Sequence, residues 1–198
     1  MNTHNLPKMM FSYTDGWQDL IKAHPAVKRM FTMYVMPMSL IPPVMFMYAS
    51  IVTPGAVFPA VMPMFSVMEA FAVAVGFYVV ELAMVALMAS IIQQMGEVVG
   101  VTPAHEEAFM LAAVAPTPLW LASLALFIPS LWVNGLALAV AWVASAALIF
   151  HGVTPLFKLQ DPGKARLMGW FVLMTGIMAW IGLMVVMTLI LSMVVGLR

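Results

Sequence analysis

Apolar residues occur in long continuous runs along this chain, and charged residues gather between the runs. No Asp, Glu, Lys or Arg occurs from Ala108 to Phe157, and this stretch is interrupted only by Pro129–Gly135. About 20 residues remain on each side of the interruption, the length of helix that crosses a bilayer core ~30 Å thick. The stretch therefore predicts a transmembrane hairpin with a short outer turn and both charged ends on one side of the membrane.

Three further apolar runs have the same character. The first contains Pro37, Pro42 and Pro43, and we expect it to kink because each proline removes a helix hydrogen bond. The second carries the acids Glu69 and Glu81. Together the runs predict five transmembrane helices at about residues 30–53, 70–95, 108–128, 135–155 and 168–195.

The segment before the first span, residues 1–29, is mixed in polarity. Trp17, Leu20 and Ile21 share one helical face, and Pro25 ends that pattern. This predicts a short interfacial helix on the cytoplasmic membrane surface, with Trp17 in the headgroup zone; the alternative is a frayed, solvated tail. Residues 30–198 would then form the five-helix membrane domain.

Composition supports lipid as the solvent. The 198 residues are 64% hydrophobic and 8% charged, whereas soluble domains carry about 25% charged residues. Backbone groups in lipid must be paired internally, and continuous rather than alternating apolar runs favour helices over a barrel. The fold class we expect is an all-α integral membrane protein.

Basic residues orient the predicted spans. They lie before the first span and between the fourth and fifth spans, whereas the loops 54–63 and 129–135 have none. Five spans place both basic segments on the same face, as the positive-inside rule requires. We therefore expect the N-terminus in the cytoplasm and the C-terminus on the outer side of the membrane. The net charge of zero gives no argument for nucleic acid as a partner.

Motifs for catalysis or cofactor binding are missing from the sequence. It has no cysteine, and its four histidines do not occur at the spacing of a zinc site. No hydrolase, P-loop or dinucleotide motif is present, so we expect no enzyme and no cofactor. The 22 methionines include pairs such as Met84/Met88 and Met174/Met178, which a copper path would use. We favour the interpretation that the methionines are adaptable apolar side chains that fill space between helices.

Glu81 is the most informative single residue. It lies roughly 18 Å from Gln93 along a helix, near the bilayer midplane, where a charge is costly. Desolvation favours the neutral acid there, and we expect it to bond to one of the polar groups at similar depth: Ser145, Thr175, Trp142 or Trp180. The two readings are a proton or cation relay and, preferred, a structural acid that ties helices together or docks a partner. Glu69 is a second intramembrane candidate nearer the outer interface, on a different helix face from Glu81.

Basic and apolar residues mix in the loop 154–168. Lys158, Lys164 and Arg166, with Trp17, are candidates to bind anionic lipid or a cytoplasmic partner. The alternative is that these charges serve topology alone.

Several short motifs carry a family resemblance. The run from Ala113 to Leu124 (AVAPTPLWLASL), followed by Phe127-Ile-Pro129, is similar to the third span of the Yip family of Ypt/Rab-interacting membrane proteins, in particular its bacterial inner-membrane branch. Leu148–Gly152 (LIFHG) resembles the end of the family's fourth span. The resemblance implies five spans in a bacterial inner membrane, with a cytoplasmic N-terminus and hence a periplasmic C-terminus. Val114 and Phe150 depart from it, because tyrosines are typical at these positions.

What carries over from the family is a class of small membrane proteins that bind or organise without known catalysis. The favoured hypothesis is a non-enzymatic inner-membrane adaptor or accessory protein that binds or organises other membrane proteins or lipids. Its partners would be the bilayer and another membrane protein or a second copy of the chain. The alternative is a small-solute, proton or lipid transporter that uses Glu81.

Overall fold

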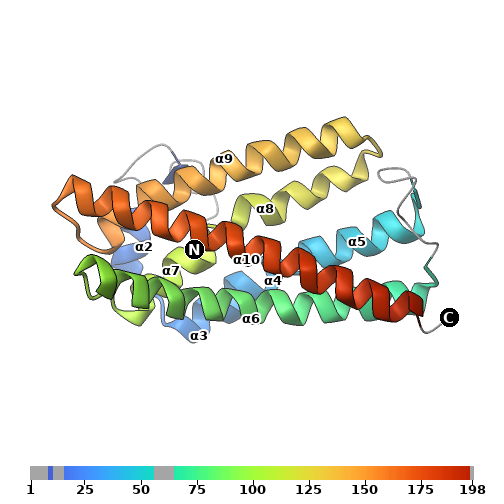
Figure 1. The fold of residues 1–198 in the computed structure, drawn as a ribbon, viewed down its shortest axis with the longest axis horizontal. Coiled ribbons are helices and arrows are strands. Elements are labelled where there is room, and N and C mark those ends of the chain that lie inside the picture. Colours follow the sequence, from blue (N-terminus) through green and yellow to red (C-terminus); the bar gives the residue numbers. More distant parts are fainter. Residues whose placement is uncertain (1–8, 11–15, 56–64, 197–198) are drawn as a thin grey trace.

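The structure is a computed structural model of the chain, and it describes residues 9–10, 16–55 and 65–196. Every regular element among these residues is helical. They form an elongated bundle, in which five segments are long and apolar enough to cross a membrane (Figure 1). These segments are Val27–Ile51, Val67–Val99, His105–Phe127, Leu131–Leu156 and Pro162–Val194. The predicted all-α membrane fold with five spans is confirmed.

The first span is a broken helix. It consists of α3 (Val27–Met30), the π-helical η2 (Phe31–Val35), α4 (Met36–Ser39) and α5 (Ile41–Ile51). Prolines lie in the first turns of α4 and α5, where the backbone N–H that proline lacks has no helical partner. The expected kink is thus a change of helix type followed by an interruption at Leu40.

The second span, α6 (Val67–Val99), is a continuous helix of 33 residues. It begins just after the N-cap Ser66 and ends at Gly100, whose φ of 75° is the left-handed conformation that glycine adopts at helix C-termini. It therefore extends a few residues beyond both ends of the predicted range 70–95.

The third span departs from the sequence prediction, which treated it as one helix. It divides at Ala115–Pro116 into α7 (His105–Val114), α8 (Thr117–Ala122) and the 3-10 helix η3 (Ser123–Phe127). Proline at the junction has no N–H for α7 to use, so the helix stops there. Every residue from Ala108 to Val114 is buried, which makes α7 the centre of the bundle.

The turn into the fourth span is shorter than predicted. The predicted interruption ran from Pro129 to Gly135, but α9 (Leu131–Leu156) already begins at Leu131. Ser130 is its N-cap, with its Oγ accepting from the N–H of Val133 at 3.5 Å, and Asn134 donates its side-chain amide to the Ile128 and Ser130 carbonyls. The polar residues that suggested a loop are thus cap residues of a helix.

A short helix precedes the first span, as expected, but its tryptophan is not an exposed interfacial contact. In α2 (Trp17–Ala23) the Trp17 side chain is 0% exposed, and its Nε1 donates to the Met9 carbonyl at 3.0 Å. The ring packs on α9 at Gly152, where an added Cβ would come within 2.5 Å of it. Trp17 therefore anchors α2 to the bundle and does not meet headgroups or a partner directly.

The last helix, α10 (Pro162–Gly196), contacts both α9 and α6. It starts beside the end of α9 and runs obliquely, so that its C-terminal half lies along α6 (Figure 1). The pair α8/α9 therefore separates from the pair α6/α10 toward the end of the bundle opposite the charged loops. This divergence sets the shape of the site described below.

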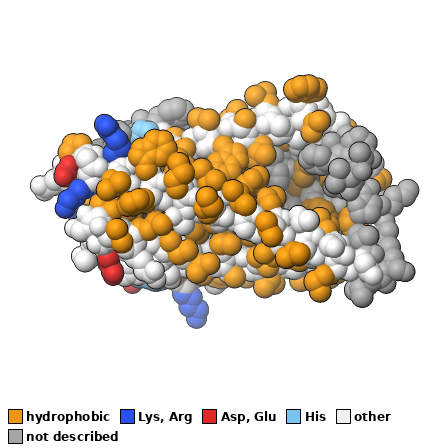
Figure 2. Space-filling view, viewed as in Figure 1, with side chains coloured by type: hydrophobic (Ala, Val, Ile, Leu, Met, Phe, Trp, Pro, Cys, Tyr) orange, Lys and Arg blue, Asp and Glu red, His pale blue; other side chains and the backbone are white. Residues whose placement is uncertain are grey.

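Figure 2 shows the charged side chains gathered at one end of the visible face, with apolar side chains along the rest of it. The basic residues of α2, α3, the loop between α9 and α10 and the first turns of α10 lie toward this end, which agrees with the sequence expectation that both basic segments share one face.

Candidate functional site

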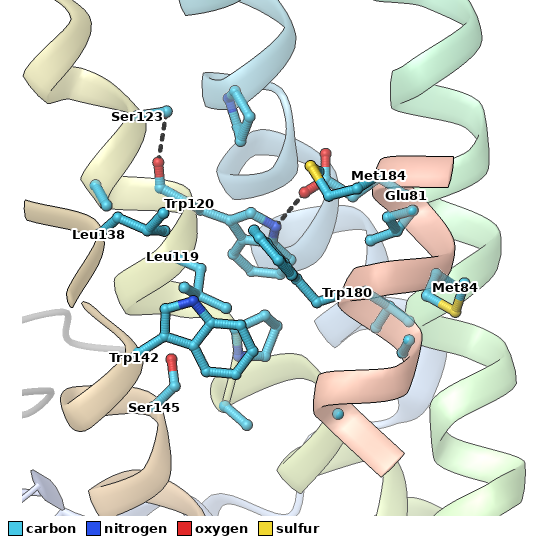
Figure 3. Close-up of a pocket in the computed structure, with 18 of the residues that line it drawn as sticks. Glu81, Met84, Leu119, Trp120, Ser123, Leu138, Trp142, Ser145, Trp180 and Met184 are labelled. Atoms are coloured by element: carbon cyan, nitrogen blue, oxygen red, sulfur yellow. Dashed lines mark hydrogen bonds between the residues drawn. The ribbon is translucent and has the colours of Figure 1, made fainter. Parts of the chain in front are cut away.

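Glu81 lies buried near the middle of α6, with 5% of its surface exposed. Its Oε1 accepts a hydrogen bond of 2.5 Å from the indole Nε1 of Trp120, which α8 presents from across the bundle (Figure 3). An indole N–H is the type of partner expected from the sequence. The four residues named there were the wrong ones, and Thr175, for example, donates to the sulfur of Met95 at 3.3 Å.

The sequence places Trp120 at a suitable depth to bond to Glu81, as it does Trp142 and Trp180. Trp120 lies about as far into the third run from Ala108 as Glu81 lies from Gln93 in the second, so the two residues share one depth. Depth along the chain does not show that the third span breaks at Pro116. After this break the helix begins again as α8, which carries the buried Trp120.

A cavity of about 410 Å³ lies beside this pair, between α6, α8, α9 and α10. Its walls are mainly apolar, and each of the four helices contributes one distinctive side chain: Glu81, Trp120, Trp142 and Trp180. The rings of Trp142 and Trp180 meet edge to face, with centroids 5.3 Å apart. Figure 3 shows the three indoles clustered on the same side of Glu81.

Two residues that line the cavity each carry a buried polar atom with no hydrogen-bond partner among the described residues. These atoms are Oε2 of Glu81 and Oγ of Ser145, and both side chains are 5% exposed. An unpaired buried polar group costs about 1–3 kcal/mol, so such atoms mark places where a ligand can pair with the protein. Among the residues that line the cavity, only Glu81 carries an acidic or basic side chain.

Glu69 does not share this environment. It forms a reciprocal capping box with Ser66: the Ser66 N–H donates to Glu69 Oε2 at 2.7 Å, and the Glu69 N–H donates to Ser66 Oγ at 3.2 Å. Its carboxylate also lies at the positive end of the α6 dipole. In the structure Glu69 is therefore a capping residue at the start of the second span.

The basic candidates all lie at the charged end. Lys158 forms an ion pair with Glu107 at 3.1 Å and is 76% exposed. The Nζ of Lys164 lies 3.6 Å from the position of an added Cβ at Gly100, so its positive charge faces the C-terminal dipole of α6. Arg166 is exposed. These contacts give Lys158 and Lys164 structural tasks at the helix ends, beside any role in binding lipid or a partner.

The methionine pairs occupy different surroundings. Met84 and Met88 line the cavity, whereas Met174 and Met178 are exposed on α10. The first pair thus contributes to the cavity wall, and the second lies on the outer surface of the bundle.

The comparisons with known proteins agree with this architecture. The family model of the Yip1 domain matches residues 8–183. No curated protein and no solved structure matches the chain. The matched region contains all of the first four spans and most of the fifth, including Glu81, Trp120, Trp142 and Trp180. The chain therefore belongs to the Yip1 domain family of multi-pass membrane proteins.

Proposed function

We propose that this chain is a non-enzymatic adaptor of a bacterial inner membrane, with its N-terminus in the cytoplasm, and that it binds another membrane protein through α10. The observation that carries the proposal is the exposure of this helix. Within the described residues, none of the most apolar 18-residue stretch of α10 is buried. One side of α10 packs on α6 and α9, and its other side leaves a long face available inside the membrane.

The exposed face has the pattern of a helix-packing surface. Large apolar side chains recur along it at intervals of three or four residues, which we call the α10 stripe: Met174, Met178, Ile181, Val185, Leu189 and Met193. Gly182 lies within this stripe, and an added Cβ there would meet nothing within 4 Å. Lipid tails can cover any apolar surface, but small residues in such a stripe let a second helix approach closely. A transmembrane helix of another protein is therefore the occupant that the stripe suits.

A second candidate function rests on Glu81. A buried acid with an unpartnered oxygen beside a partly open cavity is the kind of group that transporters of protons or small solutes use. The cavity wall, however, offers no second ionisable side chain to which a proton could pass. The adaptor proposal is favoured for this reason.

Affinity purification from gently solubilised membranes, followed by mass spectrometry, tests the proposal. The adaptor account expects a different membrane protein in stoichiometric amount. It also expects the double variant Val185→Trp/Leu189→Trp to lose that protein, because two bulky indoles would fill the α10 stripe. The matched control is Val140→Trp/Val143→Trp, at exposed positions of α9. Recovery of this chain alone, or of further copies of itself only, would overturn the adaptor proposal.

A further inference from the structure

The cavity beside Glu81 combines groups for which an adaptor has no evident use. One acid and three indoles, each from a different helix, face a space of about 410 Å³. This volume falls in the range of small-molecule sites, about 300–1,000 Å³. The cavity is too small for a partner helix and large enough for a compact ligand.

The chemistry of the wall restricts that ligand. Its body must be apolar, because most of the wall is. Trp142 and Trp180 add indole rings, whose negative π-faces attract cations more strongly than other aromatic side chains do. Oε2 of Glu81 adds a buried oxygen with no partner among the described residues.

A positive centre is the group that satisfies both features at once. A neutral apolar molecule would leave Oε2 unpaired, and an anion would be repelled by both the carboxylate and the ring faces. Among the lining residues no lysine, arginine or histidine is present to neutralise Glu81 from within. A bound cation would stabilise Glu81 as the carboxylate, and the proton of the otherwise neutral acid would pass to solvent.

Access from the membrane is compatible with such a ligand. Leu138 of α9 and Met184 of α10 line the cavity and are also exposed on the surface of the spans. These residues therefore connect the cavity wall with the outer surface of the spans, where the lipid can dissolve an apolar cation.

We propose that this cavity is a binding site for a lipophilic organic cation. The charged centre lies between Glu81 and the indoles of Trp142 and Trp180, and the apolar body fills the rest of the space. Ser145 Oγ, the other unpartnered atom in the wall, accepts or donates a hydrogen bond when the ligand carries a suitable group.

Calorimetric titration of the purified full-length chain tests this inference. The probe is tetraphenylphosphonium, and tetraphenylborate serves as an anion of the same shape. We expect the cation to bind and the anion not to bind. Triphenylphosphine oxide, a neutral relative of the probe, should bind at least about tenfold more weakly than the cation. No binding of the cation, or equal binding of the neutral compound, would overturn the proposal.

Variants separate a role of the acid from general apolar binding. Glu81→Gln keeps an oxygen to accept from Trp120 but removes the charge, and should weaken the cation at least about tenfold. Glu97→Gln, an exposed acid on the same helix, should leave the affinity unchanged. Trp142→Leu and Trp180→Leu leave the Glu81–Trp120 bond untouched and should each weaken binding several-fold. They also provide a test if Glu81→Gln does not fold. Unchanged affinity in a folded Glu81→Gln variant, or in both tryptophan variants, would contradict the site.

Discussion

Trp120 donates its indole N–H to Glu81 at 2.5 Å, and this bond joins α8 to α6 between two buried side chains. It satisfies one of the two carboxyl oxygens, while the other remains unpartnered among the described residues. The pair therefore has two consequences. It holds the broken third span against the second, and it fixes the orientation of the carboxyl group of Glu81.

Removing the donor tests the structural consequence. Trp120→Phe keeps most of the apolar volume but leaves both oxygens of Glu81 unpaired, so the protein should lose about 1–3 kcal/mol of stability. Thermal unfolding of the purified chain in detergent measures this loss. In a double-mutant cycle with Glu81→Leu, the two losses should be less than additive, because the second change removes the stranded acid. Strict additivity would show that the bond contributes nothing.

The contact of Trp17 with Gly152 predicts how the N-terminal helix is held. Gly152→Ala places a methyl group within 2.5 Å of the indole, so the ring must move and the overpacking should cost about 1–3 kcal/mol. The readout is a change in tryptophan fluorescence together with faster proteolysis at Lys22, which follows the ring in α2. Gly135→Ala, where an added Cβ meets nothing within 4 Å, is the matched control. If both variants behave alike, α2 is not anchored through Trp17.

The capping box of α6 predicts a local effect at the opposite end. Ser66→Ala removes the hydroxyl that accepts from the Glu69 N–H and should cost about 1 kcal/mol. Amide hydrogen exchange of the first turn of α6 should accelerate, whereas exchange near Val85 should not change. Ser66→Thr keeps a capping hydroxyl and should preserve the protection. Uniform acceleration along the helix would point to global destabilisation instead of a lost cap.

Neutralising Glu81 distinguishes the two candidate functions. If the chain is an adaptor, the Glu81→Gln variant should retain the partner on purification. The reason is that Glu81 is buried in α6, whereas the α10 stripe lies on the outer surface of the bundle. A proton-coupled transporter would lose flux in liposomes with the same variant. Solute or proton flux in wild-type liposomes that disappears with Glu81→Gln would therefore favour the transporter.

Hydropathy predicts the spans because a bilayer imposes one length scale on every helix that crosses it. The details that were not predicted depend on helix breaks, on helix caps or on contacts between distant segments. The sequence contains a signal for two of them. Pro116 marks the break in the third span, and Ser66 followed three residues later by Glu69 marks the capping box of α6. The burial of Trp17 against Gly152 was not visible, because it joins segments far apart in the chain through a contact that only packing defines.

The candidate site, too, was predictable from the sequence only in part. The depth of Glu81 and its need for a neutral hydrogen-bond donor followed from the energetics of an acid in hydrocarbon. The identity of that donor did not, because several indoles lie at similar depth and the choice depends on how α8 is rotated after the break at Pro116. The edge-to-face pairing of Trp142 with Trp180 likewise depends on the oblique course of α10.

Site-specific photo-crosslinking in intact membranes tests the central claim, binding of another membrane protein through α10, most directly. A photoreactive side chain replaces Val185 in the α10 stripe and, as the control, Val143 on the exposed surface of α9. If α10 binds another membrane protein, position 185 gives a discrete adduct with that protein and position 143 gives none. No adduct from position 185, or the same pattern from both positions, would contradict this claim.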